Sequence, residues 1–161
     1  GERGSTIIDE NAITIISFAG RNSAKRLEET IDGIDIQLMK SYPHAQLVYI
    51  NFADVKEVPS GLRGFAGEII QFLNNRLKKQ RRKKYAKLNL SHTADNSIFQ
   101  LTPDWDGRYH NAFGLENADQ FVCWIVYNGK VIGYLPEGTK QFSKTYYQLI
   151  EQTIQQSDKD E

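Results

Sequence analysis

Residues 13–31, ITIISFAGRNSAKRLEETI, contain the change of pattern that decides the fold. The residues before Gly20 are mostly apolar or β-branched, which predicts a strand over 12–19 that is buried on both sides. After Gly20 the apolar residues Leu27, Ile31, Ile34 and Leu38 recur at three- and four-residue steps, as on one face of a helix. We expect Asn22 or Ser23 to cap that helix, because a short side-chain oxygen can accept hydrogen bonds from the first-turn amides.

The flanking chain alternates between strand and helix patterns. The clearest pattern is QFVCWIVYNGKVIGYLPEG at 120–138, where two apolar strands surround Asn128-Gly129, a strong hairpin signal. The other expected elements are a strand at 46–52, a helix after Pro59 with Leu62, Phe65, Ile69, Phe72 and Leu77 on its apolar side, a strand and turn at 98–107, and a last helix with Phe142, Tyr146, Leu149 and Thr153 on one face.

The order β-α-β-α-β-α-β-β-α predicts an α/β protein. We expect a mixed sheet with helices on both faces, a closing β-hairpin and a C-terminal helix. The length of 161 residues suits one domain. We divide the chain into a flexible N-terminus at 1–11, the domain at 12–156 and a frayed polar tail at 157–161.

The composition excludes few functional classes. Twenty basic and twenty acidic residues cancel, so no global field steers a partner. The single cysteine, Cys123, cannot form an internal disulfide, so cysteine usage does not decide the compartment. No apolar run is long enough to span a membrane. We expect a soluble protein and favour the cytoplasm slightly, although a signal segment could have been removed.

The order of elements resembles the thioredoxin fold, and within it the peroxiredoxin and thiol-reductase-like branch, over about residues 12–156. The resemblance rests on three pieces: ITIISFAG before a helix, IFQLTPDWDGRYHNAFGL at 98–115, and FVCWIVYNGKVIGYLPEG at 121–138. The resemblance implies a redox site at residues 21–25, where the family has its cysteines, and a cis-proline just before the hairpin strand.

This chain lacks both halves of the implied redox site. Residues 21–25 are Arg21, Asn22, Ser23, Ala24 and Lys25, and Phe121 stands where the family has its cis-proline. No thiolate is available there to be activated by a helix N-terminus. We therefore expect neither a dithiol oxidoreductase nor a thiol peroxidase.

The turn at 20–25 is the first candidate binding site. Amides at a helix N-terminus favour an anion, and Arg21 and Lys25 would add positive charge beside Asn22 and Ser23. The alternative is an ordinary capped helix. The resemblance implies that Phe121 and the turn from Asp104 to Gly107 converge on this site.

The acidic turn Asp104-Trp105-Asp106 could hold a cation or form a binding loop, but turn chemistry alone also explains Asp-x-Asp-Gly. Cys123 lies mid-strand, where a small buried hydrophobic role is the usual one. The histidines, His44, His92 and His110, show no metal-ligand spacing and are expected at the surface. We predict no metal and no cofactor.

A basic run is the densest local feature of the sequence. Eight of the twelve residues from 76 to 87 are basic: Arg76, Lys78, Lys79, Arg81, Arg82, Lys83, Lys84 and Lys87. Such a surface suits nucleic acid, an anionic membrane or an acidic protein. The alternative is a solvated helix end, where cations favour the helix dipole. No helix-turn-helix, zinc or RNA-recognition signature accompanies the run.

These observations favour a redox-inactive, thioredoxin-like binding domain. Its partner would be another protein, bound at the degenerate redox site, on the basic helix, or on both. Two alternatives stay open. One is nucleic-acid or anionic-surface binding through Arg76 to Lys87. The other is a non-thiol enzyme or anion-binding protein that uses Arg21 with Asp104 or Asp106.

Overall fold

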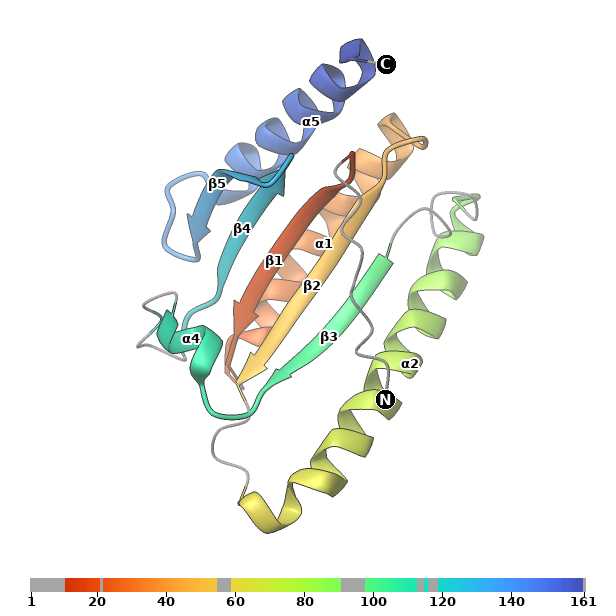
Figure 1. Ribbon diagram of the computed structural model, residues 1–161. Helices are drawn as coiled ribbons and strands as arrows, with labels where there is room; N and C mark the ends of the chain where they lie inside the picture. Colours follow the sequence, from red (N-terminus) through yellow and green to blue (C-terminus); the bar gives the residue numbers. More distant parts are fainter. Residues whose placement is uncertain are drawn as a thin grey trace.

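The computed structural model describes residues 11–20, 22–54, 59–90, 98–112, 115 and 119–160 (Figure 1). Its elements, in chain order, are β1 (Ile13–Ala19), α1 (Ala24–Ser41), β2 (Leu47–Asp54), a 3₁₀ turn η1 (Ser60–Leu62), α2 (Arg63–Lys87), β3 (Ile98–Asp104), α4 (Arg108–Ala112), β4 (Val122–Tyr127), β5 (Lys130–Pro136) and α5 (Phe142–Asp160).

The five strands form one open sheet in the order β3-β2-β1-β4-β5. β2 pairs in parallel with β1 and with β3, whereas β4 runs antiparallel to both β1 and β5. The predicted α/β class, a mixed sheet with a closing hairpin and a C-terminal helix, is confirmed. Because β1, β2 and β3 are parallel, their carboxyl ends lie at the same end of the sheet. The segments that follow these strands therefore start close together (Figure 1).

Helices lie on both faces of the sheet, but unequally. Ile13 and Ile15 of β1 belong to the core that α1, α2 and α5 complete on one face. The alternate residue Phe18 points to the other face, where its ring meets His110 of the short helix α4 at a centroid distance of 5.3 Å. The larger hydrophobic core therefore lies on the side of the three long helices.

The closing hairpin turns at the predicted dipeptide. Asn128 and Gly129 both have positive φ, 50° and 71°, as a tight two-residue turn requires. The β4–β5 register shifts between Ile125 and Val126. Next to this shift, Gly133 lets α5 approach closely, because a Cβ at that position would lie 2.8 Å from Cδ1 of Leu149.

The buried faces of α1 and α5 follow the predicted spacing. Leu27, Ile31 and Leu38 of α1 are buried, and so are Phe142, Tyr146 and Thr153 of α5. Helix α5 continues to Asp160, so the stretch predicted as a frayed tail is helical through residue 160. Nε2 of His44 lies 2.9 Å from a carboxylate oxygen of Asp158 and holds this last part of the helix to the domain. The predicted flexible segment 1–11 falls almost wholly outside the described residues.

The predicted burial of one side of α2 is wrong at every named residue except Leu77, which is half-buried. Phe65, Ile69 and Phe72 are 68%, 57% and 65% exposed, and Leu62 just before the helix is 53% exposed. The helix packs on the sheet through its opposite side, where Oδ1 of Asn74 accepts a hydrogen bond from the backbone N–H of Leu101 and Tyr85 is buried. Its first turns extend past the carboxyl ends of the strands, so no part of the sheet lies under them (Figure 1).

Candidate functional site

The turn that follows β1 is held by its own polar groups. Ser23 is the N-cap residue of α1, but its side chain makes no capping hydrogen bond to the helix. Its fully buried Oγ instead accepts the backbone N–H of Gly20 at 2.9 Å. Asn22 is exposed, and its Nδ2 donates to Oδ1 of Asp119 at 3.2 Å. The expectation that Asn22 or Ser23 caps the first-turn amides is therefore wrong. Arg21 lies outside the described residues.

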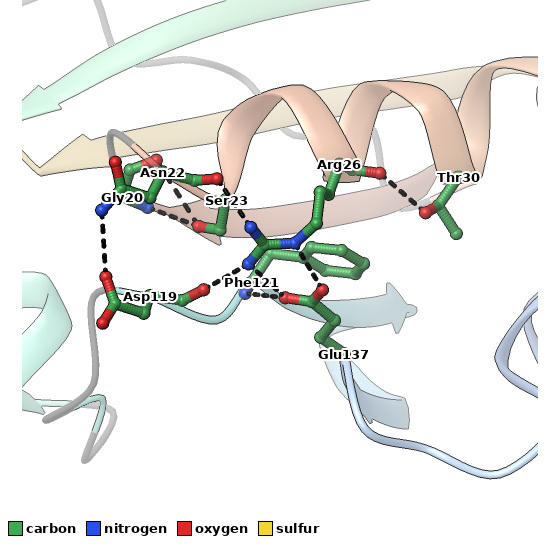
Figure 2. A network of polar contacts seen from close by, with 8 residues as sticks. All are labelled: Gly20, Asn22, Ser23, Arg26, Thr30, Asp119, Phe121 and Glu137. Atoms are coloured by element: carbon green, nitrogen blue, oxygen red, sulfur yellow. Dashed lines mark hydrogen bonds and ion pairs between the residues drawn. The ribbon is translucent and has the colours of Figure 1, made fainter.

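Arg26, one turn into α1, is the centre of the polar network at this site (Figure 2). Its guanidinium makes a two-pronged ion pair with Glu137, at 2.7 Å from Nε and 3.0 Å from Nη2. It also donates to the backbone oxygens of Asn22, at 2.8 Å, and of Asp119. The hydrogen bond with Glu137 raises the pKa of Arg26 and lowers that of Glu137, so both groups stay charged. Arg26 thus joins the 20–25 turn to the segments on either side of the hairpin.

Phe121 occupies the position of the implied cis-proline. Its side chain is buried and packs edge-on against Phe142, with ring centroids 5.5 Å apart. Its backbone N–H donates to Oε1 of Glu137 at 3.3 Å, a bond that proline could not make (Figure 2). The described part of the chain contains no cis peptide bond. Phe121 therefore serves the core with its ring and the Arg26–Glu137 pair with its amide.

The acidic turn after β3 is engaged in internal contacts. Asp104 is buried and accepts the backbone N–H of Tyr109 at 3.2 Å and of His110 at 2.9 Å. Its Oδ2 also lies 2.6 Å from Nδ1 of the buried His110. Burial disfavours the charged form of Asp104, but these hydrogen bonds outweigh it and hold the pKa below its usual value. The exposed Asp106 pairs with Arg63 at 2.9 Å, and Trp105 is half-buried. The turn therefore holds the start of α2 and the short helix α4 in place.

The three segments expected to converge do so only in part. The 20–25 turn and residues 119–121 touch directly through Asn22 and Arg26. The Asp104 turn reaches this region through α4, where His110 packs on Phe18 near the end of β1. Lys25 has 85% of its side chain exposed and pairs with Glu29 of the same helix at 3.8 Å.

The basic run occupies the second half of α2. Seven of its eight predicted residues are exposed: Arg76, Lys78, Lys79, Arg82, Lys83, Lys84 and Lys87. Lys84 forms an ion pair with Asp32 of α1. Arg81 differs, since it turns inward, with its guanidinium over the rings of Tyr49 at 4.9 Å and Tyr85 at 5.6 Å. Arg81 is therefore not part of the basic surface on which the sequence placed it.

One side of α2 faces solvent along its whole length. Phe65, Ile69 and Phe72 are followed at the same three- and four-residue steps by Arg76, Lys79, Lys83 and Lys87, and all seven are exposed. We call these seven residues the outward line of α2. Its first half is apolar and its second half is basic, and Leu62 and Leu73 widen the apolar half.

A buried polar cluster lies on the opposite side of α2, between it and α1. Asp35 of α1 is 1% exposed and its Oδ1 accepts a hydrogen bond from Tyr146 at 3.0 Å. Burial raises its pKa to about 7, against the opposing effects of the Arg81 charge and the tyrosine hydroxyls. The sequence did contain a signal for this group, because Asp35 continues the buried spacing of Leu27 and Ile31. No such signal marks Arg26 and Glu137, which lie far apart along the chain.

The other chemically reactive side chains are also engaged. Cys123 is fully buried, and burial raises its pKa to about 12. Its sulfur lies 3.6 Å from Oγ of Ser17. His44 is at the surface as expected, His110 is buried against expectation, and His92 lies outside the described residues. Among the described residues, no three histidine, cysteine or acidic side chains are grouped as a metal site requires. In the same part of the chain, no helix is long and apolar enough to cross a bilayer.

The comparisons with known proteins identify no family. No protein-family model matches the chain, and no curated protein matches it. Among solved structures, the chain is similar to one from Neisseria meningitidis described as the solution structure of a "putative thioredoxin". The similarity covers 92% of this chain and 78% of that one, with 18% identity and a TM-score of 0.48. The assignment of function therefore depends on the geometry of this chain alone.

Proposed function

We propose that this protein is a non-catalytic binding domain, and that it binds anionic lipid surfaces through the outward line of α2. The observation that carries the proposal is the exposure of Phe65, Ile69 and Phe72 beside a dense basic run. Single exposed hydrophobic residues are common on proteins, but a contiguous row of large ones marks an interaction surface.

The shape of the outward line suits a flat target. Its residues recur at steps of three and four, so they lie along one side of a straight helix. Helix α2 has 25 residues and is therefore about 37 Å long. It lies at the β3 edge of the molecule, and its first turns reach beyond the sheet (Figure 1). Because all seven side chains of the line are exposed, a flat surface could contact them together.

The two chemistries of the line suit an anionic bilayer better than nucleic acid. Phenylalanine and isoleucine side chains can enter the boundary between headgroups and acyl chains, while the lysines and arginine contact the headgroups. Each basic residue near an anionic membrane contributes roughly 1 kcal/mol, and this term weakens as salt rises. A phosphate backbone would use the basic half of the line only.

The degenerate redox site is a weaker candidate for the binding surface. Arg26 satisfies Glu137 and two backbone oxygens there, and Asn22 and Ser23 bond within the site. A partner would have to break this network before it could bind. The same network supports a non-catalytic role, because its charged groups already have partners.

Vesicle flotation tests the proposal. The probes are phosphatidylcholine vesicles with and without phosphatidylserine, at low and near-physiological salt. We expect binding only to the phosphatidylserine vesicles. Phe65→Ser with Phe72→Ser should lose binding at physiological salt, and Lys79→Glu with Lys83→Glu should lose it at both salt concentrations. All four side chains are exposed, so circular dichroism should report an unchanged fold.

The matched control is Lys25→Glu with Lys144→Glu, an equal charge reversal at exposed positions outside α2. It should bind as the wild type does. Equal loss in this control would mean that net charge, and not the outward line, drives binding. Short single- and double-stranded oligonucleotides, tested by fluorescence anisotropy, distinguish the alternative. If they bind at physiological salt and the vesicles do not, nucleic acid replaces lipid as the target.

A further inference from the structure

A cavity of about 180 Å³ opens between α1 and α2, over the carboxyl end of β2. Its walls are mostly apolar, formed by residues such as Leu27, Ile31, Leu77 and Leu101. A cavity of roughly 150 Å³ is enough to hold a benzene molecule. The space therefore suits a molecule with one small ring or a short branched chain.

Two polar atoms among the groups that line this cavity, Oδ2 of Asp35 and the hydroxyl of Tyr49, make no hydrogen bond of ordinary geometry to the described residues. The two groups lie close to each other, since each acts on the pKa of the other. Asp35 and Tyr49 are each 1% exposed. Buried polar atoms in folded proteins nearly always have partners, so this pair is suited to the polar end of a ligand. An apolar cavity with a few converging polar groups is the usual form of a small-molecule site.

The charge at this end of the cavity selects the ligand class. Arg81 lines the cavity and carries a positive charge over the Tyr49 ring. Two acidic side chains besides Asp35 also line it, but Asp32 is paired with Lys84 and Glu28 is exposed to solvent, so the charge of Arg81 dominates at the Asp35 end. A ligand ammonium group would be repelled by Arg81, whereas a carboxylate would be attracted and could accept from the Tyr49 hydroxyl. We propose that the cavity between α1 and α2 binds a small apolar monocarboxylate, whose carboxylate meets Asp35, Tyr49 and Arg81.

Binding of a carboxylate should be coupled to a proton on Asp35. The titratable and charged groups that act on Asp35 or are acted on by it come from five elements: Tyr49 of β2, Cys123 of β4, Tyr146 of α5, Arg81 and Tyr85 of α2, and Asp32 of its own helix. Two carboxylates in contact cannot both stay ionised, so the ligand should bind when Asp35 is protonated. Since the pKa of Asp35 is about 7, affinity should fall about tenfold from pH 6 to pH 8.

The first experiment uses three ring compounds that differ in their polar group. Benzoate, benzyl alcohol and benzylamine are titrated into the full chain at pH 6 and pH 8, and amide shifts are followed by two-dimensional NMR. We expect benzoate to bind most tightly at pH 6 and to shift amides around the cavity. Calorimetry in two buffers of different ionisation enthalpy should detect proton uptake with benzoate at pH 8. Equal binding of benzylamine, or no benzoate binding at pH 6, would overturn the proposal.

The variants test whether the cavity is the site. Tyr49→Phe removes only the hydroxyl and should weaken benzoate binding about tenfold, as expected for one hydrogen bond to a charged group. The matched control is Tyr134→Phe, which removes an exposed hydroxyl on β5 outside the cavity lining and should bind benzoate within about twofold of wild type at pH 6.

A second variant keeps the test decisive if Tyr49→Phe fails to fold. Leu77 lines the cavity from α2 and is half-buried, so Leu77→Trp should fill the space and abolish binding. Benzoate binding that persists in this variant would place the site elsewhere and contradict the proposal. The cavity and the outward line lie on opposite sides of α2, so failure of one proposal leaves the other standing.

Discussion

Asp35 combines two properties that oppose each other. It lies on the buried face of α1, yet it is a carboxyl group, and burial disfavours its charged form. The hydroxyl of Tyr146 and the charge of Arg81 compensate in part. Because the folded-state pKa is about 7 and the ordinary value is 3.8, the folded protein holds this proton more tightly than the unfolded chain does.

This difference predicts how stability depends on pH. Below the ordinary pKa, Asp35 is protonated in both the folded and the unfolded chain, so it does not change the free energy of unfolding with pH. As the pH rises from about 4 to about 7, only the unfolded chain ionises, so Asp35 lowers the free energy of unfolding over that range. Above pH 7 both states are ionised at Asp35, and the free energy of unfolding falls no further. The total decrease is about 4 kcal/mol as an upper bound.

Asp35→Asn tests this prediction, because asparagine keeps the shape and cannot ionise. We expect the variant to be more stable than wild type at pH 8 and nearly equal at pH 4, as measured by urea unfolding. A slope between pH 4 and 7 that is the same in Asp35→Asn and in wild type would refute the assignment.

At the scale of elements, α2 differs most from expectation. Its existence follows from the sequence, but its rotation does not. The row from Phe65 to Phe72 is the more apolar side, and by hydrophobicity alone it should face the sheet. The contacts of Asn74, Arg81 and Tyr85 instead hold the other side to β2 and β3. These contacts involve polar atoms from distant segments, and the spacing of apolar residues along one helix does not predict them.

Two glycines allow the packing of α1 and β5 to be compared. Gly33 lies in the middle of α1, and a Cβ there would meet nothing within 4 Å. Gly33→Ala should therefore stabilise the protein by about 0.5–1 kcal/mol, because alanine loses less backbone entropy in a helix.

Gly133→Ala is the contrasting substitution. Its Cβ would come within 2.8 Å of Leu149, which packs between α5 and β5, so we expect a loss of about 1 kcal/mol. The free energies of unfolding from urea titrations check both. Stabilisation by Gly133→Ala, or destabilisation by Gly33→Ala, would contradict the packing described for these elements.

For the molecule as a whole, the sequence predicted the architecture far better than the site. The strands and the Asn128-Gly129 turn follow from local patterns, and local patterns suffice for the order of elements. The Arg26–Glu137 pair and the Asp35 cluster depend on which segments meet in space. Asp104 shows the same limit, since its neighbours predicted a turn correctly while its buried contact with His110 depends on the packing of α4.

Cys123 reports on the integrity of the whole molecule. It lies in β4 and is 0% exposed, and its thiol pKa of about 12 leaves almost no thiolate at pH 8. We expect a chromogenic aromatic disulfide reagent to react with the native protein only as fast as the protein opens. In urea the same thiol should react within seconds. Rapid reaction of the native protein would show that β4 is less protected than its burial indicates.

The position of β1 at the centre of the sheet has a consequence for folding during synthesis. β1 pairs on one side with β2, which follows soon in the chain, and on the other with β4, where Thr14 lies opposite Val126. The ribosome must therefore make most of the protein before the second edge of β1 is covered. Until then a nascent chain exposes one apolar strand edge, which is the kind of surface that recruits chaperones or pairs with a neighbouring chain.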